Sequence, residues 1–181
     1  MIARLISLNE KAHPLAKEAL YIVAGAFLLA LLSQISIPLK PVPVNLQTVG
    51  VLVIGLTYAP RAAFLSLVMF IMMGAAGLPV FSNFSGGAHI LVGPTAGYLM
   101  SFPVAAGMMA LLKERFDLTS RWHLLALACL GQTIVFMGGV GWLSHLIGAK
   151  NALLMGFLPF LLPGIAKTII TTAMVAYLRK A

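Results

Sequence analysis

Lys167 is the charged residue that lies deepest in an apolar segment of the sequence, and it points to chemistry with an anion. It stands in the run from Ala152 to Leu178, twelve residues before Arg179. A helix rises about 1.5 Å per residue, so the two residues are about 18 Å apart along its axis. If Arg179 marks the inner interface, Lys167 lies just to the outer side of the midplane of a hydrocarbon core about 30 Å thick. A lysine at this depth indicates a functional site, and a side chain that snorkels to an interface is the alternative.

The sequence offers Lys167 no acidic partner within an apolar segment. The four acidic residues all lie at or near the expected cytoplasmic side: Glu10, Glu18, Glu114 and Asp117. An unpaired ammonium in a membrane must lose its proton, reach water or bind an anion. The simplest anion is a substrate from outside, a small molecule with one carboxylate and a neutral, partly apolar body. Lys40, in an expected external loop, would strengthen the attracting field. Candidate aromatic walls, for which packing alone is the alternative, are Phe81, Phe84, Tyr98, Phe102 and Trp142.

The stretch from Gly74 to Tyr98 has the composition of a loop that folds around a ligand. It contains six glycines, two prolines and no charged residue. Glycine permits positive φ and close backbone approach, and Pro94 suits the first turn of a following helix. We therefore expect an external binding loop at 77–93 that leads into a helix. A plain glycine-rich connector is the alternative.

A second external segment, Ile37–Val44, contains three prolines and should be extended. It leads to Asn45, Gln47 and Thr48 at the outer start of a short helix. Two interpretations remain open there. Asn45 caps the helix, or Gln47 faces a ligand cavity.

The elements that must position these residues are membrane helices. Of the 181 residues, 61% are hydrophobic and 9% are charged, which indicates one integral membrane domain covering 1–181. We expect an all-α membrane protein with six spans; five is the alternative, because a proline and Arg61 alone separate the second from the third. The last span should be interrupted at Pro159 and at Pro163-Gly164, as helices that line cavities often are. The expected spans are 19–36, 45–58, 61–76, 95–112, 122–146 and 152–178.

The distribution of basic residues orients these spans. Six spans put both termini on one side, and that side receives nine of the twelve basic residues: Arg4, Lys11, Lys17, Arg61, Lys113, Arg115, Arg121, Arg179 and Lys180. The other side receives Lys40 and Lys150. The positive-inside rule then places both termini in the cytoplasm and the loop at 77–93 outside. We expect a multi-pass membrane protein.

The sequence argues against catalysis, nucleic-acid binding and bound cofactors or metals. The spans contain no Asp or Glu that could relay protons, and His89 and His145 have no carboxylate beside them in the sequence. Cys129 is the single cysteine, which excludes a cysteine metal cluster. No phosphate-binding loop motif is present either. A chain that binds a solute without such a motor either takes power from partners or only equilibrates the solute.

Several of these segments are similar to one known family. The sequence resembles the BioY family, the biotin-binding S components of energy-coupling factor (ECF) transporters. The resemblance covers nearly the whole chain and is densest in PVPVNLQTVGVLVIGL (Pro41–Leu56), GLPVFSNFSGG (Gly77–Gly87) and GPTAGYLMSFP (Gly93–Pro103), with a weaker match in PFLLPGIAK (Pro159–Lys167).

The resemblance implies a fold, a ligand, a location in the bacterial inner membrane, and partners. The fold is that of an ECF S component: six helices, both termini inside, and a biotin pocket near the extracytoplasmic face. The partners are a membrane coupling subunit and two cytoplasmic ATPases, with which the loaded subunit topples to carry its ligand across. Docking in such transporters uses an A-x-x-x-A face on the first helix, which Ala26 and Ala30 match. Internal packing of these small residues is the alternative.

The resemblance also implies binding roles. Asn83 would hydrogen-bond the ureido ring, Tyr98 would line the pocket and Lys167 would face the valerate carboxylate. The other candidate biotin-binding residues are Gln47, Phe81, Gly86, Lys40 and Gly164. Relatives tend to read PGDxxK near the end, with an aspartate where this chain has Gly164. Either the Gly164 carbonyl or Gln47 replaces that acceptor, or affinity or ligand choice differs.

Three classes of function remain. A biotin-binding subunit for uptake explains the loop, the buried lysine and the missing motor. A self-sufficient facilitator, or an S component for another small carboxylated vitamin, explains the same site. A membrane enzyme explains little, because the spans lack groups for general acid–base chemistry.

Overall fold

Nearly all of the chain is helical, with one short hairpin and two short helical turns between the helices. The computed structural model describes residues 2–179, and the side chains of residues 15–179. Arg4, Lys11 and Glu10 have side chains outside this part, and Lys180 lies outside it altogether. The elements are α1 Ile2–Gln34, β1 Ser36–Ile37, β2 Val44–Asn45, α2 Gln47–Thr57, α3 Pro60–Ala75, η1 Ser82–Phe84, η2 Ala88–Val92, α4 Ala96–Arg115, α5 Arg121–Ile147, α6 Ala149–Ala152, a π-helical turn η3 Leu153–Phe157, and α7 Leu158–Leu178.

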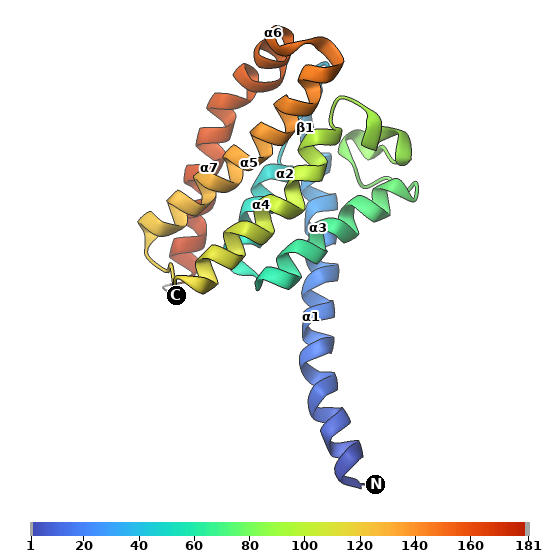
Figure 1. The fold of residues 1–181 in the computed structure, drawn as a ribbon, viewed down its shortest axis with the longest axis vertical. Helices are drawn as coiled ribbons and strands as arrows, with labels where there is room; N and C mark the ends of the chain where they lie inside the picture. The colour runs from blue at the N-terminus through green and yellow to red at the C-terminus, as the bar shows by residue number, and fades with distance from the viewer. Residues whose placement is uncertain (1, 180–181) are drawn as a thin grey trace.

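The helices form a bundle with two different ends. The α4–α5 turn and both termini lie toward one end, and α1 extends well beyond it (Figure 1). The β1–β2 hairpin, η1, η2 and α6 lie at the opposite end (Figure 1). The irregular segments that the sequence marks as external are therefore gathered at a single end, away from the termini.

Four helical segments are long and apolar enough to cross a membrane, and two more are apolar but shorter. The four are Leu15–Gln34, Ala96–Arg115, Arg121–Ile147 and Ala149–Leu178, and the shorter two are α2 and α3. Each of the six expected ranges overlaps one of these helices, with ends that differ by a few residues. The second and third expected spans are separate helices, α2 and α3. They are separated because Ala59 is extended before Pro60, which occupies the first turn of α3. The expected multi-pass, all-α fold is confirmed.

The irregular turn in the last helical segment lies just before Pro159, one of the two places where the prolines predict a break. The π-helical turn covers Leu153–Phe157, and α7 then runs from Leu158 through Pro163 without interruption. The predicted break at Pro163-Gly164 is wrong. Proline is tolerated inside membrane helices because neighbouring groups and small local adjustments satisfy the freed carbonyl.

The short helix α2 ends inside the bundle, and basic side chains reach its last carbonyls. Its 11 residues rise only about 16 Å at 1.5 Å per residue. Lys113 of α4 donates to the Leu56 and Tyr58 carbonyls at 2.8 and 3.3 Å, and Arg179 donates to the Leu56 carbonyl at 3.3 Å. Cations at a helix C-terminus satisfy unpaired carbonyls and oppose the negative end of the helix dipole. These three bonds fix the end of α2 that lies nearer the chain termini.

Small residues allow close helix packing at several crossings. A Cβ at Gly139 on α5 would lie 2.1 Å from the Tyr98 ring on α4. Ala26 on α1 is completely buried in the core, while Ala30 is half-buried. At Ala26 the small side chain therefore serves internal packing, which was the alternative interpretation of the Ala26–Ala30 pair. A partner helix can reach the pair only at Ala30.

We predict that Gly139→Ala destabilises the protein, because the added methyl group overlaps the Tyr98 ring. Overpacking of this kind costs about 1–3 kcal/mol. Gly141→Ala on the same helix is the matched control, since nothing lies within 4 Å of its Cβ position. Thermal unfolding in detergent should show a lower Tm for Gly139→Ala only. Equal Tm values for the two variants would contradict the packing assigned to Gly139.

Candidate functional site

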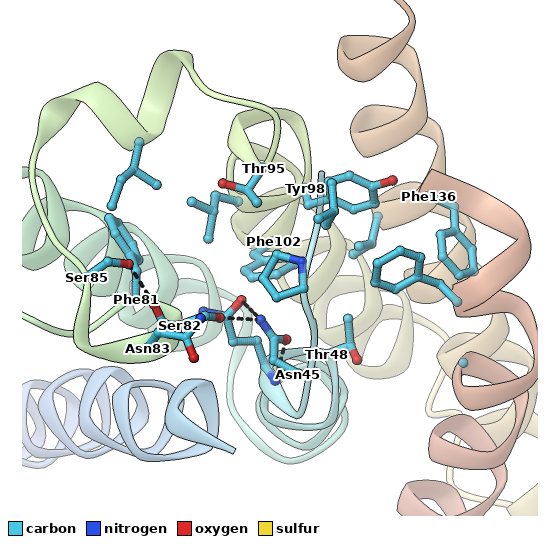
Figure 2. A pocket seen from close by; sticks show the side chains of 18 of the residues that line it. Asn45, Thr48, Phe81, Ser82, Asn83, Ser85, Thr95, Tyr98, Phe102 and Phe136 are labelled. Carbon is cyan, nitrogen blue, oxygen red and sulfur yellow. Dashed lines mark hydrogen bonds between the residues drawn. The ribbon is translucent and has the colours of Figure 1, made fainter. Parts of the chain in front are cut away.

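A cavity of about 290 Å³ lies between the β1–β2 hairpin, the start of α2, the segment 80–95, and α4, α5 and α7. Its side chains converge from elements that are far apart in the sequence (Figure 2). The polar lining residues are Asn45, Gln47, Thr48, Ser82, Asn83, Ser85, His89, Thr95, Gln132 and Lys167. The aromatic lining residues are Phe81, Tyr98, Phe102, Phe136 and Phe160. A pocket with an aromatic body and a few convergent polar groups is typical of small-molecule sites.

Lys167 crosses from α7 to the other wall of the cavity. Its Nζ donates to the Asn45 carbonyl at 2.5 Å and lies 3.4 Å from Thr48 Oγ1. Both partners are neutral oxygens, so they accept hydrogen bonds but do not compensate the charge. Among the side chains of residues 15–179, the salt bridge that forms joins Glu18 Oε1 and Arg61 Nε, 3.3 Å apart, and does not involve Lys167. Lys167 thus keeps an uncompensated positive charge at the cavity wall.

Asn45 and Gln47 form a small network at the start of α2. The Asn45 Oδ1 accepts the backbone N–H of Gln47 at 3.1 Å, while its Nδ2 donates to Gln47 Oε1 at 2.9 Å and to Ser82 Oγ at 2.7 Å. Figure 2 shows these bonds joining the hairpin to the loop. Leu46, rather than Asn45, is the N-cap residue of α2, but both side-chain positions that the two interpretations expected are present. Asn45 satisfies the first N–H of α2, and Gln47 lines the cavity.

The end of α1 holds the loop at 80–85 in place. Gln34 Nε2 donates to the Phe81 carbonyl at 3.2 Å, and Gln34 Oε1 accepts the Phe84 N–H at 2.8 Å. Ser33 Oγ donates to the Val80 carbonyl. Asn83 adopts a left-handed conformation, with φ 59° and ψ 38°, which asparagine tolerates better than most residues. Its Oδ1 accepts a hydrogen bond from Ser36 Oγ at 3.1 Å.

Tyr98 is fixed at both ends of its side chain. Its hydroxyl donates to the Gly156 carbonyl in the π-helical turn at 2.7 Å. Its ring stacks against that of Phe160, with an angle of 29° between the planes and centroids 6.1 Å apart. A π-helical turn leaves carbonyls out of the regular ladder, and the Tyr98 hydroxyl occupies one of them. Because the hydroxyl hydrogen is used in this bond, the part of Tyr98 that is left for a ligand in the cavity is its ring.

Comparison with known proteins agrees with this arrangement. The sequence model of the BioY family matches residues 6–181. The chain belongs to the BioY family.

Relatives and a solved structure agree over most of the chain. A probable biotin transporter BioY of Pyrococcus horikoshii is 36% identical, covering 84% of this chain and 90% of its own. The biotin transporter BioY of Thermotoga maritima is also 36% identical, covering 88% and 95%. The crystal structure of the S-component for biotin from an ECF-type ABC transporter superposes with a TM-score of 0.84 at 25% identity, covering 93% of this chain and 94% of that one. The expected family and the S-component fold are both confirmed.

The structure brings most of the candidate BioY site residues to one cavity. Those that line it are Asn83, Tyr98, Lys167, Gln47, Phe81 and Gly164. Lys40 and Gly86 do not. Lys40 is exposed in the turn between β1 and β2, and a Cβ on Gly86 would lie 2.3 Å from the Leu78 carbonyl oxygen, so Gly86 serves the packing of the loop.

Two of the candidate aromatic walls also lie elsewhere. Phe84 is 71% exposed. Trp142 donates from its indole N–H to the Gly93 carbonyl at 2.9 Å and does not line the cavity. The sequence gave no sign of this for Phe84, because the positive φ of Asn83 and Phe84 changes the direction of the side chains in the loop. Trp142 lies on α5, where its direction depends on how the helices pack.

Sequence reasoning missed several cavity residues, above all Ser82, Gln132 and Phe136. Gln132 and Phe136 stand four residues apart on α5, which places them on the same helix face. A glutamine in an otherwise apolar span was a usable signal for a site. Ser82 has no comparable signal, because its place follows from the folded loop.

We predict that Gln34→Leu loosens the loop at 80–85 while the helices stay intact. The Phe84 N–H and the Phe81 carbonyl lose their partners, at a local cost of roughly 1–3 kcal/mol. Hydrogen–deuterium exchange should therefore become faster in the peptide that covers this loop. Thr57→Val, which removes an exposed hydroxyl bonded only to the Val53 carbonyl, is the control. Unchanged exchange at Phe84 in Gln34→Leu would show that α1 does not hold the loop.

Proposed function

We propose that this protein is the biotin-binding membrane subunit of an uptake system. It captures biotin from outside the cell and delivers it to the cytoplasm. The observation that supports this function is a cavity whose wall carries Lys167, a cation with neutral partners only, in a member of the BioY family. Biotin has one carboxylate, an apolar chain and thioether ring, and a neutral cyclic urea. Its charge and polarity match the expected ligand.

Lys167 is the proposed carboxylate-binding residue. Its ammonium has three N–H donors, of which one is used at 2.5 Å by the Asn45 carbonyl. A bound carboxylate would compensate the charge in a partly buried site, where a charge-assisted hydrogen bond is strong. Asn83 is the proposed partner of the ureido ring, and Phe81 and Tyr98 are proposed walls for the apolar body. The membrane-bound coupling subunit and two ATPases of an ECF module are the proposed partners.

We propose the cell membrane as the location, with both termini in the cytoplasm. The loop at 77–93 is then external. The supporting observations are the excess of basic residues toward the end of the bundle that carries the termini and the position of the cavity at the opposite end.

Lys167→Met should weaken biotin binding by roughly 2–5 kcal/mol, because the carboxylate loses a partly desolvated cation. Methionine keeps most of the apolar stem, so the packing changes little. Binding of labelled biotin and of biotin methyl ester to the purified protein measures the effect. The ester should bind weakly to the unchanged protein, and Lys167→Met should reduce its binding no further. Equal affinity for biotin and its ester would remove Lys167 from carboxylate recognition.

Biotin uptake should depend on ATP hydrolysis by partner proteins, because the chain carries no phosphate-binding loop. We expect saturable uptake in proteoliposomes that contain this protein with an ECF coupling subunit and two ATPases. ATPases with their phosphate-loop lysines replaced by alanine are the control. Uptake that is equally fast without the module would instead identify a self-sufficient facilitator.

A further inference from the structure

Gln132, in the middle of α5, presents a buried hydrogen-bond acceptor without a partner. Its Oε1 is one of three buried side-chain oxygen atoms, across the side chains of residues 15–179, that accept or donate no hydrogen bond. The other two are the hydroxyl oxygens of Thr171 and Thr172, which do not line the cavity. A buried carbonyl oxygen left unpaired is costly, so such a group in a cavity wall indicates a ligand.

The amide of Gln132 stands beside Gly164 on the facing helix α7. A Cβ at Gly164 would lie 3.4 Å from Gln132 Nε2 and 3.3 Å from Phe136 Cζ. Because residue 164 is glycine, no side chain fills the space next to this amide. Gln132 and Gly164 both line the cavity, so the amide borders the space that a ligand would occupy.

Gln132 finds no partner on its other side. There it borders a groove of about 630 Å³ between α5 and α7, whose lining is mainly apolar and includes Leu161, Ile165 and Ile169. In a membrane this groove meets lipid chains, which donate no hydrogen bonds. A donor to Oε1 would therefore come from the cavity, on the side of Gly164, where Nε2 now lies. A half-turn of the terminal amide exchanges the two atoms and presents Oε1 to that space.

Each of the other amide oxygens of the cavity, and the Gly164 carbonyl, already accepts at least one hydrogen bond. Asn45 Oδ1 accepts the Gln47 N–H, and Gln47 Oε1 accepts Asn45 Nδ2. Asn83 Oδ1 accepts the Ser36 hydroxyl, at 3.1 Å. The Gly164 carbonyl accepts the Thr168 hydroxyl at 2.8 Å. Among the amide oxygens of the described cavity lining, Gln132 Oε1 is therefore the one that accepts no hydrogen bond at all.

We propose that Gln132 Oε1 accepts a hydrogen bond from a ureido N–H of biotin, an inference that rests on the proposed function. With the carboxylate ionised, the two ureido N–H groups are the only hydrogen-bond donors that biotin carries. Gln132 therefore recognises the urea end of the ligand. Lys167 reaches away from α5 to the Asn45 carbonyl and the Thr48 hydroxyl, so the amide and the ammonium are presented from different walls.

The test combines a change in the protein with a change in the ligand. Gln132→Met keeps an unbranched side chain of similar length but removes the acceptor. Its affinity is compared with that of the unchanged protein for biotin and for the two biotin derivatives that carry one methyl group on either ureido nitrogen. Thr133→Val, the next residue on α5, is the matched control, because its exposed hydroxyl bonds only to the Cys129 carbonyl.

We expect Gln132→Met to weaken biotin binding roughly five- to a hundredfold, and Thr133→Val to leave it unchanged. One of the two methylated ligands should bind the unchanged protein more weakly than biotin does. For that ligand, Gln132→Met should cause no further loss of affinity. Gln132→Glu keeps an acceptor oxygen, so it should still prefer biotin over that ligand. This variant gives the same comparison if the methionine variant does not fold.

Two results would overturn the role of Gln132. One is biotin affinity of Gln132→Met within about twofold of the unchanged protein. The other is a loss of the same size for biotin and for both methylated ligands, which would indicate a general disturbance of the cavity. An unchanged protein that binds no biotin at all would instead overturn the proposed function, and this inference with it.

Discussion

The contact between the Lys167 ammonium and the Asn45 carbonyl is the interaction on which the site depends. It joins α7 to the junction of β2 and α2, 122 residues earlier in the chain, and it closes one side of the cavity. A lysine can remain in the interior of a membrane protein only if polar groups surround it. Here those groups are a backbone carbonyl and a hydroxyl, which stabilise the ammonium without neutralising it. The remaining positive charge is what makes the cavity suited to an acid.

A second constraint is that every irregular backbone group at this end of the bundle needs a partner. The loop at 80–85 leaves the helical ladder, and α1 supplies what the loop lacks through Ser33 and Gln34. The hairpin adds Asn45, which bonds to Ser82. Loops are usually mobile, but one whose carbonyls and N–H groups are held from two sides is pre-organised for a ligand. The side chain of Gln132 on α5 differs from these groups, because its Oε1 accepts no hydrogen bond, and it is the acceptor that we propose for a donor on the ligand.

The two ends of the molecule differ in the kind of contact that holds them together. Around the cavity, short elements and glycine bring polar groups together, as Gly164 does beside Gln132. Toward the termini, Lys113 and Arg179 close the end of α2 with ordinary helix-capping bonds. The exposed face of α1, which includes Tyr21, Phe27 and Leu31, remains uncovered within this chain. In the proposed transporter such a face would lie against lipid or the coupling subunit.

The sequence by itself determined the class of protein, the six apolar segments and the central place of Lys167. Composition and helix length report on the bilayer, and a charge among apolar residues is conspicuous in one dimension. Sequence also brought Asn83, Gln47, Phe81 and Tyr98 into the candidate site through motif resemblance. Only the tertiary structure decided that Lys40, Gly86, Phe84 and Trp142 lie away from the cavity, and that Ala26 is buried. The direction of a loop side chain and the side of a helix on which a small residue packs depend on contacts between distant segments. The lack of a partner for Gln132 Oε1 depends on such contacts too. No local pattern records those contacts.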